Sequence, residues 1–160
     1  MQTVTILCVG KLKEKFYFDA CAEYQKRLTR FCRLNLIELP EQRLPDTPSP
    51  AEIAAALERE ADAIMEKLPR GGAVVALCVE GRGLSSEKLA ETMANYAARG
   101  VSQLTFLIGG SFGMAERVKD AADLRLSMSQ MTFPHHLARV MLLEQVYRAY
   151  QIQAGTKYHK

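Results

Sequence analysis

Residues 73–79 read Ala-Val-Val-Ala-Leu-Cys-Val, an almost wholly apolar run between Gly71-Gly72 and the segment Glu80-Gly-Arg-Gly83. A short apolar run that is bounded by glycines and shows no polar alternation is typical of a strand buried on both faces of a sheet. A second run of this kind, Leu104–Ile108, ends at Gly109. Strands that are buried on both faces belong to parallel sheets, so the two runs predict an α/β protein.

The segments around these runs alternate between the two periodicities. Further strands are predicted at Thr3–Val9, Leu34–Leu39 and Asp123–Met128. Helices are predicted over Tyr17–Phe31, Pro50–Leu68, Ser86–Ala98, Ala115–Ala121 and His136–Ile152. The second of them begins at Ser49-Pro50-Ala51-Glu52, which has the spacing of a capping box. This alternation predicts a mostly parallel sheet with helices on both faces, in one domain over residues 1–160.

The composition is that of an ordinary globular protein. The chain has 160 residues, of which 48% are hydrophobic and 24% charged, which excludes a disordered or collagen-like chain. No apolar run approaches the length of a membrane span, and Met1–Gly10 has the pattern of a strand rather than a signal peptide. The four cysteines and three histidines show no metal-ligand spacing. We therefore expect a cytosolic protein with reduced cysteines, no metal and no membrane partner.

The charge is distributed unevenly along the chain. Lys and Arg number 21 against 18 Asp and Glu, a net charge of only +3. Basic residues gather between Lys11 and Arg33, and residues 153–160 contain Lys157, His159 and Lys160 without an acidic side chain. The pattern fits either a face that meets a polyanion or the ordinary solvated surface of helices.

Three predicted loops lie at the carboxyl ends of strands, where open parallel sheets bind their ligands. They are Glu80–Gly83, Gly109–Gly113 and Ser129–Pro134. The glycines of the second loop would let a ligand approach the backbone, although a tight turn has the same signature. Neither a G-x-G-x-x-G nor a P-loop pattern is present, so a dinucleotide or a triphosphate is not indicated.

The predicted helix over His136–Ile152 is apolar on nearly all sides, with Glu144 and Arg148 four residues apart as an exception. A small α/β domain does not easily cover one helix completely, so we infer a homodimer with this helix at the interface; a core helix is the alternative. Glu144 and Arg148 would be either a structural ion pair or an active-site pair. The segment Lys157-Tyr-His-Lys160 adds a phenol, an imidazole and two cations, unless it is simply a frayed tail.

The C-terminal third also resembles a known family. The segments Phe106–Gly113, Leu126–His135 and Leu137–Tyr150, together with Tyr158-His159, are similar to the SPOUT methyltransferases. Within them they resemble a small subfamily that methylates N3 of a pseudouridine in large-subunit ribosomal RNA. The resemblance covers the whole chain and is most specific in these segments.

The resemblance implies an α/β fold with a deep trefoil knot in the C-terminal third and S-adenosyl-L-methionine as the cofactor. Matched position by position, the cofactor-binding residues would be Leu77, Gly109, Gly110, Gln130, Met131, Thr132, Phe133, Pro134 and His135. The cofactor carries no phosphate, so the missing phosphate motifs are no objection. Apolar side chains in this set suit an adenine ring.

The resemblance further implies a homodimer whose active site is shared between the subunits. The catalytic residues would be Glu144, Arg148, Tyr158, His159 and Lys160, from the last helix and the tail. The substrate would be ribosomal RNA in the assembled ribosome, which would provide recognition that so small a chain cannot. Two other functions stay open: a SPOUT enzyme that acts on transfer RNA, and a ribosome-binding factor without enzymatic activity.

Overall fold

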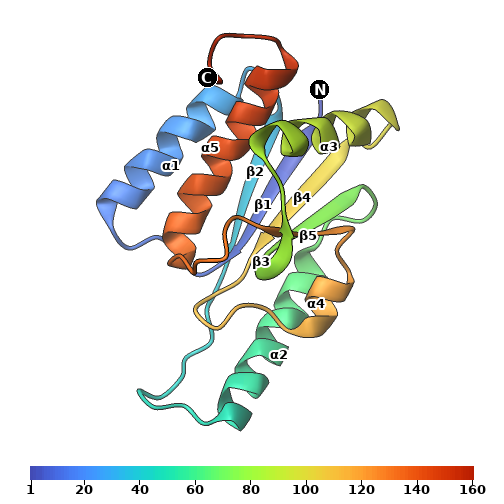
Figure 1. Cartoon of the computed structure of the whole chain (residues 1–160). Helices are drawn as coiled ribbons and strands as arrows, with labels where there is room; N and C mark the ends of the chain where they lie inside the picture. The colour runs from blue at the N-terminus through green and yellow to red at the C-terminus, as the bar shows by residue number, and fades with distance from the viewer.

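A computed structural model describes residues 1–160, and its centre is a five-stranded parallel sheet in the order β2-β1-β4-β3-β5 (Figure 1). The strands are β1 (Thr3–Val9), β2 (Arg33–Leu39), β3 (Ala73–Gly83), β4 (Gln103–Ile108) and β5 (Leu124–Ser127). All neighbouring strands pair in parallel. The predicted α/β class and parallel sheet are thus confirmed.

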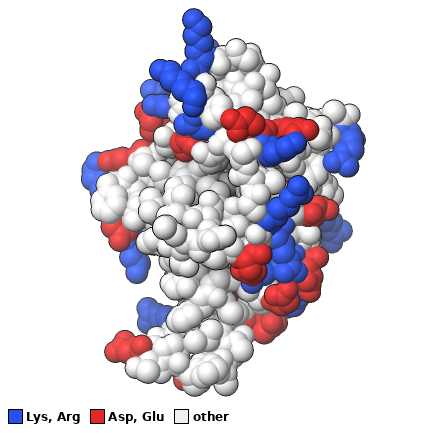
Figure 2. Space-filling model, in the orientation of Figure 1, with Lys and Arg blue, Asp and Glu red and all other residues white.

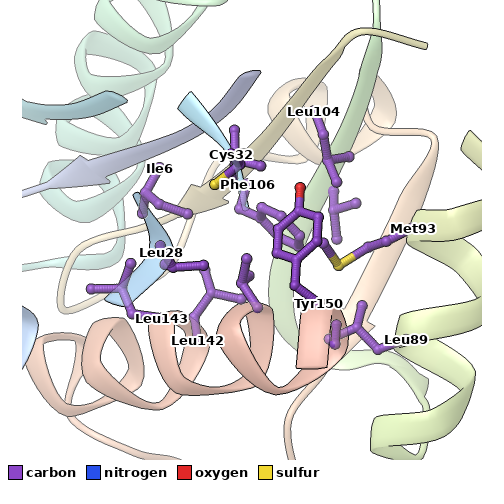
Figure 3. Packing of buried hydrophobic residues seen from close by; sticks show 14 of the residues in the cluster. Ile6, Leu28, Cys32, Leu89, Met93, Leu104, Phe106, Leu142, Leu143 and Tyr150 are labelled. Atoms are coloured by element: carbon purple, nitrogen blue, oxygen red, sulfur yellow. The ribbon is translucent and has the colours of Figure 1, made fainter. Parts of the chain in front are cut away.

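Helices cover both faces of the sheet. They are α1 (Lys15–Leu28), α2 (Pro50–Lys67), α3 (Ser86–Ala98), α4 (Glu116–Asp120) and α5 (His135–Gln153). One core lies between the sheet and α1, α3 and α5; Figure 3 shows Leu142, Leu143 and Tyr150 of α5 packed with residues of the strands and of the other two helices. A smaller core on the opposite face joins the sheet to α2 and α4.

The local signals in the sequence predict most helix ends well. The capping box is formed: Glu52 N donates to Ser49 Oγ at 3.1 Å, and Ser49 N donates to Glu52 Oε1 at 3.0 Å. Helix α1 differs from its prediction, because it begins at Lys15 and ends at Leu28 rather than spanning 17–31. Its last turn closes where the Thr29 hydroxyl donates to the Lys26 carbonyl, so the chain can turn into β2.

The prediction of a loop at Glu80–Gly83 was wrong, because these residues belong to the end of β3. A bulge separates Leu77 from Arg82, and both pair with Leu126 of β5. Gly81 allows this pairing, since a Cβ there would lie 2.8 Å from the carbonyl carbon of Arg125. Burial was expected for the whole run 73–79, but only residues 73–76, which pair with β4, are buried. Val79, beyond this pairing, is 47% exposed.

Helix α5 lies in a trough between α1 and α3, where Figure 1 shows it across the front of the sheet. The chain therefore covers the flanks of this helix itself. The prediction that a domain of this size cannot cover such a helix was wrong, so the apolar surface of α5 alone does not require a partner. Residues 135–152 are all buried or half-buried, and the half-buried stripe faces away from the sheet. No helix is long and apolar enough to span a membrane. The four cysteines are free.

Candidate active site

A cavity of about 840 Å³ opens at the carboxyl ends of β3, β4 and β5. Its walls include Leu77 of β3, the loop after β4 and the loop between β5 and α5. All the residues expected to bind a cofactor line it except Gln130, which is exposed in the loop beside it. The lining residues of that set are Leu77, Gly109, Gly110, Met131, Thr132, Phe133, Pro134 and His135. The structure thus brings together two loops that are about 20 residues apart in sequence.

Backbone and side-chain hydrogen bonds fix both loops. Gly110 and Gly113 form an antiparallel bridge, in which Gly113 N donates to the Gly110 carbonyl at 3.0 Å. In the second loop, Met131 N donates to Ser129 Oγ at 3.0 Å, and Ser127 Oγ donates to the Ser129 carbonyl at 2.8 Å. Both walls of the cavity are therefore ordered by contacts within the chain itself.

The size and the lining chemistry of the cavity fit a molecule such as S-adenosylmethionine. Its volume lies within the range usual for small-molecule sites, and much of its lining is apolar. Met131 is 72% and Phe112 49% exposed, so two large apolar side chains of the lining are free to contact an aromatic ring. Lys119 and Glu80, which form an ion pair, lie in the same lining and offer opposite charges to an amino-acid zwitterion.

His135 and Glu41 meet at the edge of this cavity, with Nε2 of the imidazole 3.8 Å from Oε2 of the carboxylate. Burial lowers the pKa of His135 below 6.5, the nearby His136 acts in the same direction, and Glu41 opposes both. Burial also disfavours the ionised form of Glu41, but the two hydrogen bonds from Ser111, together with smaller electrostatic contributions from His135 and His136, outweigh it, so the pKa of Glu41 is lowered. At neutral pH, a neutral imidazole therefore faces a charged carboxylate.

The lowered pKa of His135 predicts a pH-dependent stability. The unfolded chain binds a proton near pH 6.5, whereas the folded chain binds it only at lower pH. The free energy of unfolding should therefore fall as the pH drops below about 6.5. Urea unfolding of the cofactor-free protein on either side of this pH tests it: His135→Asn should show a smaller pH dependence than the wild type. An equal dependence in both proteins would contradict the assignment.

A second polar group, here called the tail cluster, consists of Glu144, Arg148, Tyr158, His159 and Glu87. Arg148 binds Glu144 Oε1 through Nη2 at 2.6 Å and through Nε at 3.0 Å. Tyr158 donates its hydroxyl to the same oxygen at 3.2 Å, and its ring lies 4.9 Å from the guanidinium carbon. The tail is therefore docked rather than frayed, and four of the five expected catalytic residues are brought together.

The hydrogen bonds of His159 define its tautomer. Its Nδ1 lies 3.1 Å from Arg148 Nη1, and its Nε2 lies 2.6 Å from Glu87 Oε1. A guanidinium can only donate, so Nδ1 accepts and the ring proton lies on Nε2, which donates it to Glu87. Lys160, by contrast, is exposed and makes no side-chain hydrogen bond or ion pair.

Both carboxylate oxygens of Glu144 accept hydrogen bonds. Its Oε1 accepts from Arg148 and Tyr158, and its Oε2 accepts from Gln145 Nε2 at 2.8 Å. Burial, followed by the neighbouring Glu144, raises the pKa of the Tyr158 phenol, which stays protonated as a donor. These contacts make Glu144 suited to holding the Arg148 guanidinium in place.

A second, smaller cavity of about 400 Å³ lies between α3 and α5. Glu144 and Gln145 form part of its wall, and it shares Leu126 and Met128 with the larger cavity. The Gln145 amide oxygen accepts from Ser86 Oγ at 2.7 Å on the same wall. The tail cluster therefore borders a hollow that adjoins the larger cavity.

Several charged residues in or near these sites were not identified from the sequence, among them Lys119 and Glu80 of the larger cavity. Glu41 and Glu87 contact residues 70 or more positions away, which no local pattern reveals. Arg139 is 1% exposed and binds Glu38 Oε2 at 2.6 Å and the Gly10 carbonyl at 3.0 Å. The sequence did contain a signal for Arg139: apart from the two histidines, it is the only polar side chain in the first half of α5.

Comparison with known proteins gives consistent results over nearly the whole chain. Residues 1–159 match the family described as "Predicted SPOUT methyltransferase". The protein named ribosomal RNA large subunit methyltransferase H in Clostridioides difficile is 46% identical over 157 residues, covering 98% of this chain and 99% of that protein. The protein of the same name in Bifidobacterium animalis is 47% identical with the same coverage.

The solved structures agree at the level of the fold. A protein from Haemophilus influenzae, described as a probable methylase family protein, superposes with a TM-score of 0.57. The match covers 98% of this chain and 70% of that one at 12% sequence identity. At this identity the likeness concerns the fold alone.

Proposed function

Since the chain belongs to the SPOUT methyltransferase family, we propose that it methylates N3 of a pseudouridine in large-subunit ribosomal RNA, using S-adenosylmethionine, on the assembled ribosome. The observation that carries the proposal is the gathering of two residue sets: the cofactor residues around one cavity and the catalytic residues in the tail cluster. A ribosome-binding factor without activity would need neither. The ribosomal substrate would place the protein in the cytoplasm.

The cofactor would lie in the larger cavity, where it supplies an electrophilic methyl group on a sulfonium. Leu77, Met131 and Phe133 would contact the adenine ring, and the backbone of the two loops would bind its polar edge. Lys119 and Glu80 would bind the carboxylate and ammonium of the methionine end. Methyl transfer is an in-line displacement, so the contribution of these residues is to position the reacting groups.

The catalytic residues are proposed to act on the cofactor of the partner subunit in a homodimer. Along α5, Arg148 is 13 residues beyond His135, or roughly 20 Å at the rise of an α-helix. An antiparallel pairing of two α5 helices about an axis near Met141 would bring the Arg148 of one subunit beside the His135 of the other. The half-buried outer stripe of α5 and the exposed Phe112 and Met131 support such an interface. In Figure 2, the centre of this face is free of charged side chains.

In the proposed chemistry, His159 Nδ1 accepts the N3 proton of the pseudouridine. Glu87 would hold the Nε2–H and stabilise the imidazolium that forms, while Arg148 would exchange its contact with Nδ1 for one with the developing imidate oxygen. The deprotonated N3 would then be the nucleophile for the methyl group that the bound cofactor would supply. Glu144 would keep the Arg148 guanidinium oriented, and Lys160 would be available to an RNA phosphate.

The basic region between Lys11 and Arg33 is proposed to contact the RNA backbone. All seven of its cations are exposed. The guanidinium carbon of Arg27 lies 5.8 Å from the ring centre of Tyr147, which in turn packs against Tyr158. The basic end of α1 therefore adjoins the tail cluster, and Figure 2 shows blue side chains gathered at this upper end of the molecule.

Reversing two of these charges should weaken binding to ribosomes. We expect Lys26→Glu/Arg30→Glu to reduce the slope of log affinity against log salt by roughly one per lost phosphate contact. Arg27 is left intact because it packs on Tyr147. The matched control is Arg43→Glu/Lys67→Glu in and near α2, two exposed cations on the opposite side of the sheet. Equal salt slopes for the two double variants would contradict the proposed face.

The knot is part of the same proposal, in which residues 1–160 form one α/β-knot domain. The chain passes from β4 across β3 to β5, and α5 then returns to the other side of the sheet between α1 and α3. This path is compatible with a trefoil in this third of the chain, which further requires that the chain pass through one of its own loops. The knot would hold the two loops of the larger cavity against each other.

Methyl transfer to different RNAs tests the function. The purified protein and methyl-labelled S-adenosylmethionine are incubated with assembled ribosomes, separated large subunits and bulk transfer RNA. The proposal predicts label in the large-subunit RNA of assembled ribosomes, with much less in free subunits and none in transfer RNA. Label in transfer RNA would favour the alternative SPOUT activity, whereas cofactor binding without transfer to any RNA would exclude this function.

A further inference from the structure

Glu41 lies in the loop between β2 and α2, and its carboxylate contacts the Gly109–Gly113 loop. Glu41 Oε1 accepts hydrogen bonds from Ser111 N at 2.9 Å and from Ser111 Oγ at 2.8 Å. The Glu41 side chain is 34% exposed and does not line the larger cavity. It therefore supports the Gly109–Gly113 loop from outside the site.

The same carboxylate also reaches the second wall of the cavity. Its Oε2 lies 3.8 Å from Nε2 of His135, and that buried nitrogen has no hydrogen-bond partner. A Cβ at Gly110 would lie 2.8 Å from Glu41 Oε1, and one at Gly10 would lie 3.5 Å from Oε2. The loop after β4, the start of α5 and the end of β1 thus converge on one side chain.

Hydrogen bonds of the neighbouring residues fix the backbone on both sides of Glu41. Its neighbour Gln42 donates its backbone N–H to Glu60 Oε2 at 2.9 Å, and the Gln42 amide oxygen accepts from Arg59 Nε at 3.0 Å. Glu60 is 6% exposed on α2, so this anchor is part of the folded core. On the other side, Leu39 is buried and accepts from Gly10 N at 2.7 Å. A charged group on so fixed a backbone can impose a position on the loop that it binds.

We infer that Glu41 is a positioning residue for cofactor binding, which holds the Gly109–Gly113 loop and His135 in the geometry that receives S-adenosylmethionine. The inference rests on the proposed function. It assigns cofactor affinity to a residue outside both the cavity and the C-terminal third. Since Glu41 neither lines the larger cavity nor contacts the tail cluster, it should affect the binding of the cofactor and leave the chemical step unchanged.

Calorimetry and kinetics of Glu41→Ala test this inference. Losing two hydrogen bonds to a charged acceptor should raise the Kd and the KM for S-adenosylmethionine roughly tenfold. The kcat at saturating cofactor and the KM for ribosomes should stay at wild-type values. Asp46→Ala, in the same exposed loop, is the matched control and should change nothing. Glu41→Gln keeps an amide oxygen for Ser111 and should recover part of the affinity.

A double-mutant cycle with Gly110→Ala separates positioning from general destabilisation. The added Cβ would displace the carboxylate of Glu41, so Gly110→Ala should weaken cofactor binding more in the wild type than in the Glu41→Ala background. Additive effects, a lowered kcat or an unchanged Kd in Glu41→Ala would each overturn the inference. Failure of the wild type to bind S-adenosylmethionine would instead count against the proposed function, so the two failures are distinguishable.

Discussion

Gly109→Ala should weaken S-adenosylmethionine binding by a factor on the order of 100, because the new methyl group would collide with the backbone of the same loop. A Cβ at this position would lie 2.5 Å from the Gly113 carbonyl oxygen, 2.7 Å from its carbon and 2.7 Å from Met114 Cγ. The bridge between Gly110 and Gly113 prevents the loop from yielding at small cost. The loop would have to open, and the cavity would lose one wall.

Calorimetry with S-adenosylmethionine measures this loss, and thermal unfolding shows whether the rest of the fold survives. Gly83→Ala is the matched control, because a Cβ there meets no atom within 4 Å. Gly83→Ala should bind as the wild type does. Tight cofactor binding by a folded Gly109→Ala protein would show that the larger cavity is not the cofactor site.

The second large effect is expected from the tail cluster. Arg148→Ala and His159→Ala should each lower kcat by a factor on the order of 100 to 10,000, while the Kd for S-adenosylmethionine stays unchanged. Arg148 is held by Glu144 at 2.6 Å and faces His159 at 3.1 Å, so either change removes a group from a preorganised set. Lys157→Ala, an exposed tail residue, is the control and should remain active. Full activity in either cluster variant would remove that residue from the scheme.

Mixed dimers test whether the site is shared between subunits. Gly109→Ala should be inactive through cofactor binding, and Arg148→Ala through chemistry. If one subunit supplies the cofactor cavity and the other the tail cluster, a mixture of the two inactive proteins should form some dimers with one complete site. Such mixtures should regain part of the wild-type rate. A mixture as inactive as its components would show that each subunit uses its own tail.

Local signals in the sequence predicted most of the fold. The strand at 73–79, the capping box at Ser49 and the alternation of elements are each determined by neighbouring residues, and all three are confirmed, although full burial of that strand holds only for 73–76. Pairing between strands is not local, so the extension of β3 through Glu80–Gly83 could not be predicted. The flanking of α5 by α1 and α3 is a tertiary contact of the same kind.

The candidate site divides in a similar way. Glu144 and Arg148 are one helical turn apart, so their ion pair was visible in the sequence and is confirmed. The contacts of Tyr158 and His159 depend on how the tail folds back, and the residues that match the family's motif pointed to them. Glu41 and Glu87 lie in exposed segments whose acidic residues resemble any solvated surface, and only their distant partners give them a role.

The identity of the methylated nucleoside tests the account most directly. Assembled ribosomes from cells with and without the relevant pseudouridylation are incubated with the protein and S-adenosylmethionine, and the large-subunit RNA is digested and analysed by mass spectrometry. We expect one new nucleoside, N3-methylpseudouridine, formed only in the pseudouridylated ribosomes. A methyl group on another nucleoside, or equal methylation of both kinds of ribosome, would contradict it.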